Sequence, residues 1–145
     1  MSGEVRTYNP ARVLVLVAAI PMQGFSDGTF VEIAPMADRV SSKSGADGEV
    51  ARSISSDKRH TVTITLQQTS PSNDVLSGMA LADELSGGGL PVPIMVQDLS
   101  GRTLFAADRG WIRSVPSQAF GVEVNDREWV LETGKPAVNI IGGNL

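Results

Sequence analysis

A regular alternation of polar and apolar side chains over residues 60–69 is the feature that most constrains this chain. The alternating positions are, in order, Thr61, Val62, Thr63, Ile64, Thr65, Leu66 and Gln67. Because successive side chains of a β-strand point to opposite faces, this segment predicts a strand with one face on a core and the other toward water. The chain must therefore contain a sheet that is buried mainly on one face.

A helix start follows that strand directly. Ser70 is a typical N-cap, Pro71 suits the first helical position, and Asp74 is an acid in the first turn. The apolar residues that can share one face of the helix are Leu76, Met79, Ala80 and Leu85. Glycines at 87–89 end the pattern, so the sequence predicts one helix over residues 71–86.

Other segments carry strand signals. The apolar, β-branched run over residues 12–20 has no polar alternation, which predicts a strand covered on both faces. Asp27 and Gly28 predict a hairpin turn that leads into a strand over residues 29–33. Further strands are expected over residues 92–99, 103–115 with a kink at Gly110, within 118–133, and over 138–141.

The length and the element count together indicate the fold class. A chain of 145 residues with 41% apolar side chains suits a single domain, here residues 1–145. About seven strands with one helix predict a mainly β (α+β) fold. We expect an antiparallel β-sandwich or partly closed barrel with one flanking α-helix.

Residues 38–58 are polar and small, and are rich in serine. They predict a long loop or an extended hairpin. Segments of this length outside the core are usually functional or ordered by a partner, so we interpret them as an interaction element. Because few apolar side chains offset the entropy of ordering, we expect this segment to be disordered in an isolated subunit.

Charge and residue types exclude several function classes. A net charge of -4 disfavours tight wrapping around nucleic acid. The chain has no cysteine, and its one histidine, His60, is expected to be exposed at the start of a strand. The carboxylate pairs Asp83-Glu84 and Asp126 with Glu128 are expected to be solvated. We therefore expect no enzyme, no metal and no cofactor, and we find no signal peptide and no membrane span.

Several segments spread over almost the entire chain carry a family resemblance. They are Tyr8–Pro10, Gly24–Phe30, Gly45–Arg52, Leu66–Asp74, Asp98–Thr103 and Arg127–Trp129. These segments resemble a family of bacteriophage structural proteins, the tail tube subunits of contractile-tailed (myovirus) phages. The string Leu-Gln-Gln-Thr-Ser-Pro-Ser-Asn-Asp is long enough to be specific.

The resemblance implies hexameric rings that stack into a tube inside a contractile sheath. The lumen would hold the tape measure protein before DNA passes through without specific binding. The implied partners are further copies of the chain, the tail sheath protein, and the baseplate and tail terminator proteins. The implied location is the virion, after synthesis in the host bacterial cytoplasm, without membrane insertion by this chain.

Two sets of residues are candidates for such an assembly. Charges of both signs in the polar segment could pair between rings, namely Asp38, Arg39, Lys43, Asp47, Glu49, Arg52, Asp57 and Lys58. The polar strand face could line the lumen together with nearby acids, as Thr61, Thr63, Thr65, Gln67, Glu128 and Glu132.

Three alternatives stay open. The chain could be another tail element, such as a tube terminator or a baseplate adaptor. It could belong to the tube of a related contractile injection machine. In a different class, a monomeric β-sandwich binding module predicts a soluble monomer with a concave apolar site.

Overall fold

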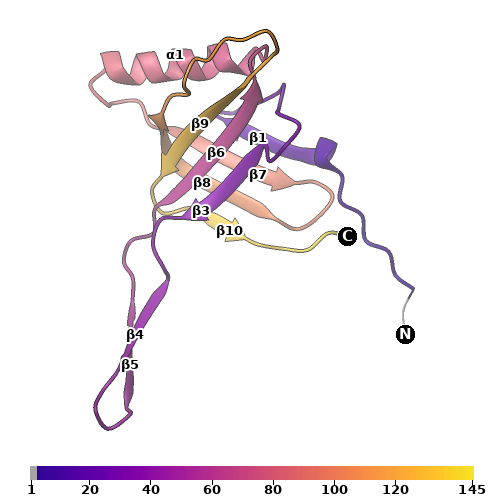
Figure 1. Ribbon diagram of the computed structural model, residues 1–145. Coiled ribbons are helices and arrows are strands. Elements are labelled where there is room, and N and C mark those ends of the chain that lie inside the picture. Colours follow the sequence, from indigo (N-terminus) through magenta and orange to yellow (C-terminus); the bar gives the residue numbers. More distant parts are fainter. Residues whose placement is uncertain (1–2) are drawn as a thin grey trace.

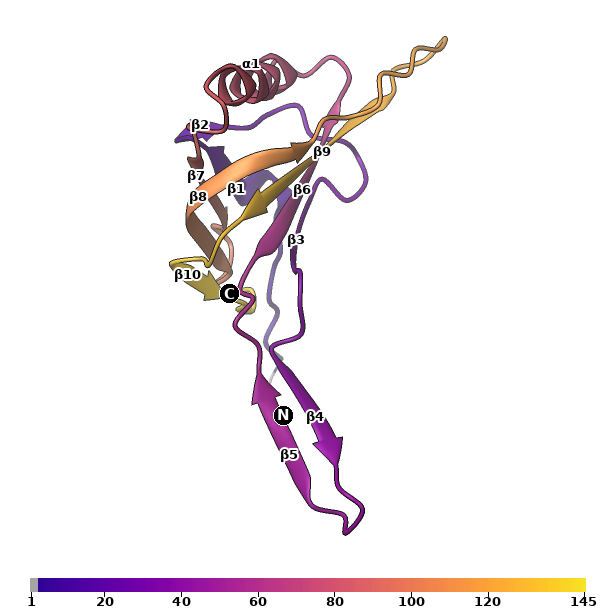
Figure 2. The same ribbon diagram turned by 90° about the vertical axis from the view of Figure 1, so that its left-hand side faces the viewer.

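One antiparallel β-sheet organises residues 3–145, the part of the chain that the computed structural model describes (Figure 1). The elements are, in order, a 3-10 turn η1 (Pro10–Arg12), β1 (Val13–Val17), β2 (Ile20–Pro21), β3 (Val31–Pro35), β4 (Val40–Ser44), β5 (Val50–Ile54), β6 (His60–Gln67), α1 (Ser72–Leu85), β7 (Val92–Asp98), β8 (Leu104–Ser114), β9 (Asp126–Thr133) and β10 (Val138–Ile140). The main sheet has the order β2-β1-β7-β8-β9-β6-β3, β10 pairs with β8, and β4 and β5 pair separately. The expected mainly β fold with one helix is confirmed, and the sheet rolls up without closing (Figure 2).

The core lies inside the rolled sheet. Val62, Ile64 and Leu66 of β6 are buried there, opposite Leu131 and Trp129 of β9. The side chains between these β6 positions are half-buried, so the alternation predicted for this strand is confirmed. The inward face of β6 thus joins the hydrophobic core, and its outward face is polar.

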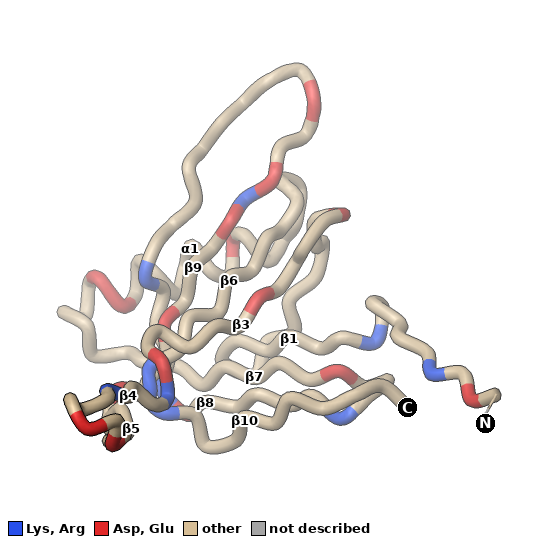
Figure 3. Tube along the Cα trace, turned by 60° about the horizontal axis from the view of Figure 1, so that its bottom comes forward, with Lys and Arg blue, Asp and Glu red and all other residues tan. Residues whose placement is uncertain are grey.

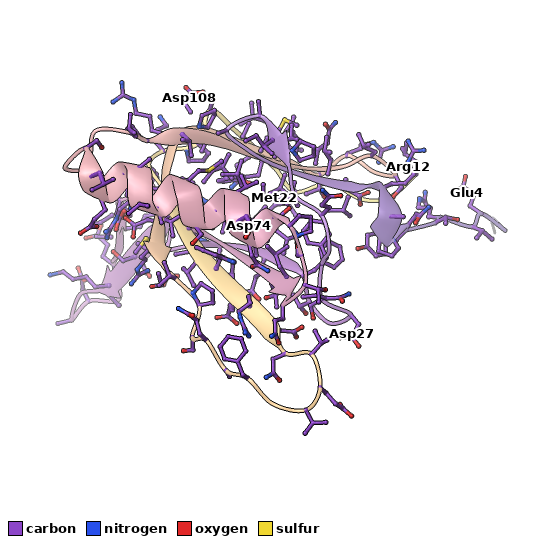
Figure 4. All side chains as sticks on the ribbon, turned by 90° about the horizontal axis from the view of Figure 1, so that it is seen from above. Glu4, Arg12, Met22, Asp27, Asp74 and Asp108 are labelled. Carbon is purple, nitrogen blue, oxygen red and sulfur yellow. The ribbon has the colours of Figure 1, made fainter. Side chains whose placement is uncertain are left out.

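Helix α1 covers one end of the rolled sheet (Figure 4). Leu76 is fully buried, and Trp129 Nε1 donates a hydrogen bond to Asn73 Oδ1 at 2.9 Å. Ser70 acts at the helix start, where its Oγ accepts from Ser72 N at 3.2 Å. The predicted apolar stripe is wrong at its far end, because α1 extends past the sheet and leaves Leu85 exposed.

Strand β1 is covered on one face only, which corrects the expectation for residues 12–20. Val15 and Val17 are buried in the core, whereas Leu14 and Leu16 are half-buried on the other face. The apolar run therefore reflects a partly covered outer face and not a second buried layer.

The first hairpin turn lies at Ala18 and Ala19, between β1 and β2. Both alanines have positive φ angles, 53° and 64°. The turn predicted at Asp27 and Gly28 is wrong, because the strand after Gly28, β3, pairs with β6 and not with β2. A distant, longer apolar strand is the partner of β3, so the Asp-Gly pair lies in a connection.

The kink predicted at Gly110 is confirmed. The register between β7 and β8 shifts where Val92 pairs with Gly110 and Ile94 pairs with Ala107. A Cβ atom at Gly110 would clash with the side chain of Ile94. The absence of a side chain therefore lets the two strands pack closely at the bulge.

Residues 115–125 form a loop where a strand was expected from residue 118 onward. The neighbouring strands end at this point, β8 at Ser114 and β6 at Gln67, which pairs with Asp126. With no strand edge beside them, residues 115–125 have no ladder to join, and β9 begins only at Asp126. The loop extends away from the body in Figures 2 and 4.

Candidate assembly surfaces

Strands β4 and β5 form a hairpin that projects from the body at the end opposite α1 (Figures 1 and 2). At its turn, Gly45 N donates to Glu49 O at 2.8 Å, and Asp47 Oδ1 accepts from Glu49 N at 3.1 Å. Gly48 has a φ of 87°, a value that glycine adopts without steric cost. Because a two-stranded hairpin is marginally stable by itself in water, we expect this element to be stabilised by a partner.

The candidate stacking charges divide between the hairpin and its base (Figure 3). Along the hairpin lie Lys43, Asp47, Glu49 and Arg52, and at its base lie Asp38, Arg39, Asp57 and Lys58. Asp57 is already engaged within the chain, because its carboxylate accepts two hydrogen bonds from Arg59 at 2.9 Å each. Side-chain and backbone hydrogen bonds from Arg59 lower the pKa of Asp57 to about 2. Arg59 was missed in the sequence, although the Asp-x-Arg spacing signals such a pair.

One face of the hairpin is apolar. Val40 lies opposite Ile54 in the β4–β5 register, and Val50 lies on the same face of β5 as Ile54. Val50 and Ile54 are both exposed. Clustered exposed apolar side chains favour burial against another surface.

The candidate lumen residues lie together on the outer face of β6 and β9. In register, Thr61 is opposite Glu132, Thr65 is opposite Glu128, and Thr63 is opposite Glu32 of β3. Glu128 is exposed, whereas Glu132 is mostly covered and lies 3.9 Å from Arg113. This face therefore combines hydroxyl groups with acids, and Glu132 is already paired.

Strand β3 leaves one edge of the sheet open. The hydrogen bonds from Met36 N and to Phe30 O indicate that the even-numbered residues of β3 bond to β6. The backbone N–H and C=O groups of Val31 and Ile33 therefore point to the open edge. Unpaired strand edges are templates for pairing with another chain.

A groove of about 660 Å³ opens at the end of the rolled sheet that α1 does not cover. Ile33, Phe105 and Ile141 contribute its apolar lining. The charged lining residues are Asp38, Arg39, Asp57, Lys58, Arg59 and Lys135. The groove thus has an apolar floor and more cations than carboxylates.

His60 lies in this groove and is buried, which corrects the expectation that it is exposed. Its Nδ1 is 3.0 Å from Lys58 O, its Nε2 is 3.3 Å from Asn139 Nδ2, and its ring centre is 5.4 Å from that of Phe105. The β6 alternation extended by one step places His60 on the inner face, so the pattern itself contained this signal. Residues 3–145 hold no cluster of three His, Asp or Glu side chains suited to a metal ion.

The loop over residues 115–125 has a fixed base and a free tip. Ala119 O accepts from Asn125 Nδ2 at 3.1 Å and from the buried Arg127 at 3.0 Å. The Arg127 guanidinium also lies 5.3 Å from the ring centre of Phe120. Within residues 3–145, no hydrogen bond involves residues 120–124. Their strand-like alternation was visible in the sequence, but its lack of a partner was not.

The chain is similar to proteins of phage tails and contractile injection systems. Residues 22–142 match the family described as "Bacteriophage PhiTE tail tube protein". Structural protein ORF10 of Pseudomonas phage KPP10 is 30% identical over 139 residues, which cover 90% of this chain and 80% of that protein. No helix of the described residues is long and apolar enough to cross a membrane.

Solved structures with low sequence identity share the fold. A chain of the anti-feeding prophage cap, the tube terminating cap, matches with a TM-score of 0.65 at 11% identity, over 100% of this chain and 96% of that one. A chain of the PVC sheath-tube complex of an extracellular contractile injection system matches with a TM-score of 0.56 at 11% identity, over 96% and 93%. A chain of the PVC sheath/tube terminator matches with a TM-score of 0.56 at 13% identity, over 98% and 99%.

Proposed function

This chain belongs to the bacteriophage PhiTE tail tube protein family, and from that premise we propose that it is the subunit of hexameric rings stacked into a tube inside a contractile sheath. It is a structural protein of the virion, made in the host bacterial cytoplasm. Its work is physical: it builds a conduit for DNA ejection. The proposed partners are other copies, the tail sheath protein, the tape measure protein in the lumen, and the baseplate and terminator proteins.

The observation that carries this proposal is the projecting β4–β5 hairpin. It extends from the body with both signs of charge and with Val50 and Ile54 exposed on one face. A contact between different surfaces of successive copies can continue without end, which is what a stacked tube requires. We propose that the hairpin, with Lys43, Asp47, Glu49 and Arg52, contacts the next ring. Full protection of residues 38–58 from amide exchange in a monomer would contradict the idea that assembly orders it.

Ring formation is proposed to use the open sheet edges. The unpaired backbone groups of Val31 and Ile33 can bond to a strand of the neighbouring copy. Closing the ring this way removes exposed donors and acceptors from every subunit.

The polar outer face of β6 and β9 is proposed to line the lumen. A ring of six copies at -4 each is strongly negative, and Glu128 on this face adds to repulsion of DNA from the wall. Weak contact with the wall suits a conduit. Exchange of Glu128 and Glu132 for lysine is expected to slow DNA ejection, and an unchanged ejection rate would count against this assignment.

Negative-stain electron microscopy of the purified protein over a concentration series, with sedimentation velocity on the same samples, tests the function. Hollow six-fold rings or tubes are the expected result. A chain that stays at its 15.3 kDa monomer mass at every concentration, even with a baseplate fraction as nucleus, would favour the monomeric binding module.

A second candidate, a tube terminator, is favoured by the structural match to the tube terminating cap. The two candidates differ in how assembly stops. A terminator forms single rings that do not stack, whereas a tube subunit forms stacks whose length grows with concentration. A baseplate adaptor or the tube of a related injection machine differs in partner and is tested by which sheath protein coats the assembled tube.

A further inference from the structure

The two ends of the rolled sheet differ in a way that suggests how copies meet. At one end α1 covers the core, and the loop over residues 115–125 extends beyond the sheet (Figure 2). At the other end no helix covers the core within residues 3–145, and the groove at the base of the hairpin is open. One end therefore presents an apolar projection and the opposite end presents an apolar recess.

We propose that residues 120–124 of one copy insert into the groove of a second copy, in a head-to-tail contact. This inference rests on the proposed tube function and assigns a surface to its stacking contact. The occupant is a second copy of this chain, since the same chain supplies both complementary surfaces.

The loop tip has the properties of a segment that lacks its partner. Phe120, Val122 and Val124 are exposed, with Phe120 at 75%, and they alternate with Gly121 and Glu123. This alternation would place the three apolar side chains on one face of an extended segment. The backbone of residues 120–124 makes no hydrogen bond within the described chain, so it can bond to a strand edge.

The base of the loop prepares the tip for binding. Arg127 and Asn125 hold Ala119 O, and the Arg127 guanidinium covers one side of Phe120. Fixing both ends of a short loop lowers the entropy that binding must overcome.

The groove matches the tip in polarity and in charge. Ile33, Phe105 and Ile141 give it an apolar lining, and the open edge of β3 brings the free backbone groups of Ile33 beside it. Its lining has four cations and two carboxylates, and Asp57 is already neutralised by Arg59. The charge on the tip is Glu123, so the contact joins an acidic projection to a basic recess.

Cysteine cross-linking between two differently tagged chains tests the contact, and the cysteine-free sequence leaves no competing thiol. One chain carries Val122→Cys and the other carries Ile141→Cys, and both positions are exposed in the single subunit. The matched control replaces the second chain with Leu85→Cys, which is also exposed but lies on α1. Disulfides need Cα atoms within about 7 Å, so only a real contact gives efficient linkage.

After co-assembly and mild oxidation, we expect the Val122→Cys and Ile141→Cys chains to shift from 15.3 kDa to a mixed dimer in a denaturing gel, and the control pair to remain monomeric. Rings or tubes in the micrographs with equal linkage of both pairs, or with Val122→Cys linking only to itself, would overturn this inference and leave the tube function standing. Monomers at every concentration with no mixed dimer would overturn both.

A second variant pair checks the energetic role of the tip. Phe120→Asp with Val122→Asp is expected to abolish sedimenting assemblies, while Leu85→Asp retains them. Both changes are at exposed positions, so folded monomers are expected by circular dichroism. Normal assembly by the loop variant would overturn the inference.

Discussion

Replacing Val50 and Ile54 by threonine tests whether the apolar face of the hairpin holds copies together. These residues are 70% and 65% exposed in the single subunit, so most of their surface remains to be buried on assembly. Full burial of such a side chain contributes about 1.5–3 kcal/mol, so the two together contribute roughly 2–4 kcal/mol. At 1.4 kcal/mol for each tenfold change, the loss raises the critical concentration for assembly by about 30-fold to several hundred-fold. Threonine is β-branched, so the hairpin keeps its strand preference.

Pelleting of wild type and variant over a concentration series measures the critical concentration. The matched control is Leu81→Gln with Leu85→Gln on α1, where both leucines are comparably exposed and glutamine is a good helix former. We expect the control to assemble at the wild-type concentration, and urea unfolding of unassembled samples to agree for all three proteins. Assembly of the hairpin variant at the wild-type concentration, or an equal shift in the α1 control, would refute the reasoning.

Three further predictions concern single subunits. Ala18→Asn with Ala19→Gly is expected to raise the free energy of unfolding by about 1–2 kcal/mol, because both positions have positive φ; an unchanged urea midpoint would contradict this. Asn73→Ala is expected to lower the free energy of unfolding by about 2–3 kcal/mol, because a buried indole N–H and two carbonyls lose their partner. Asn73→Asp keeps the acceptor and is expected to cost less, so equal losses in urea unfolding would argue against that account. The carboxyl of Asp57 is expected to titrate by NMR near its pKa of about 2, and Arg59→Gln to move the pKa toward 3.8. Because the folded pKa is depressed, this pair supports the hairpin base above about pH 4 and is lost as the pH falls toward 2, and an identical titration in the variant would exclude Arg59 as the cause.

Local patterns in the sequence determined the conformation of most segments. The alternation over residues 60–69 became β6 with its apolar side chains inward, and the Ser-Pro start preceded α1 at Ser72–Leu85. Gly110 marked the bulge in β8. Each of these features depends on side chains a few residues apart, so spacing within the segment is enough to reveal it.

Only the tertiary structure decided which segments meet. Pairing of β3 with β6 left Asp27 and Gly28 in a connection, and packing beneath β6 buried His60 against Phe105. The ends of β6 and β8 left residues 115–125 without a strand partner, although their composition resembles a strand. The groove likewise comes from residues far apart in the chain that the rolled sheet gathers at its uncovered end. A local period specifies which face of a segment is apolar, but the strand or surface that covers that face depends on long-range packing, which no single segment encodes.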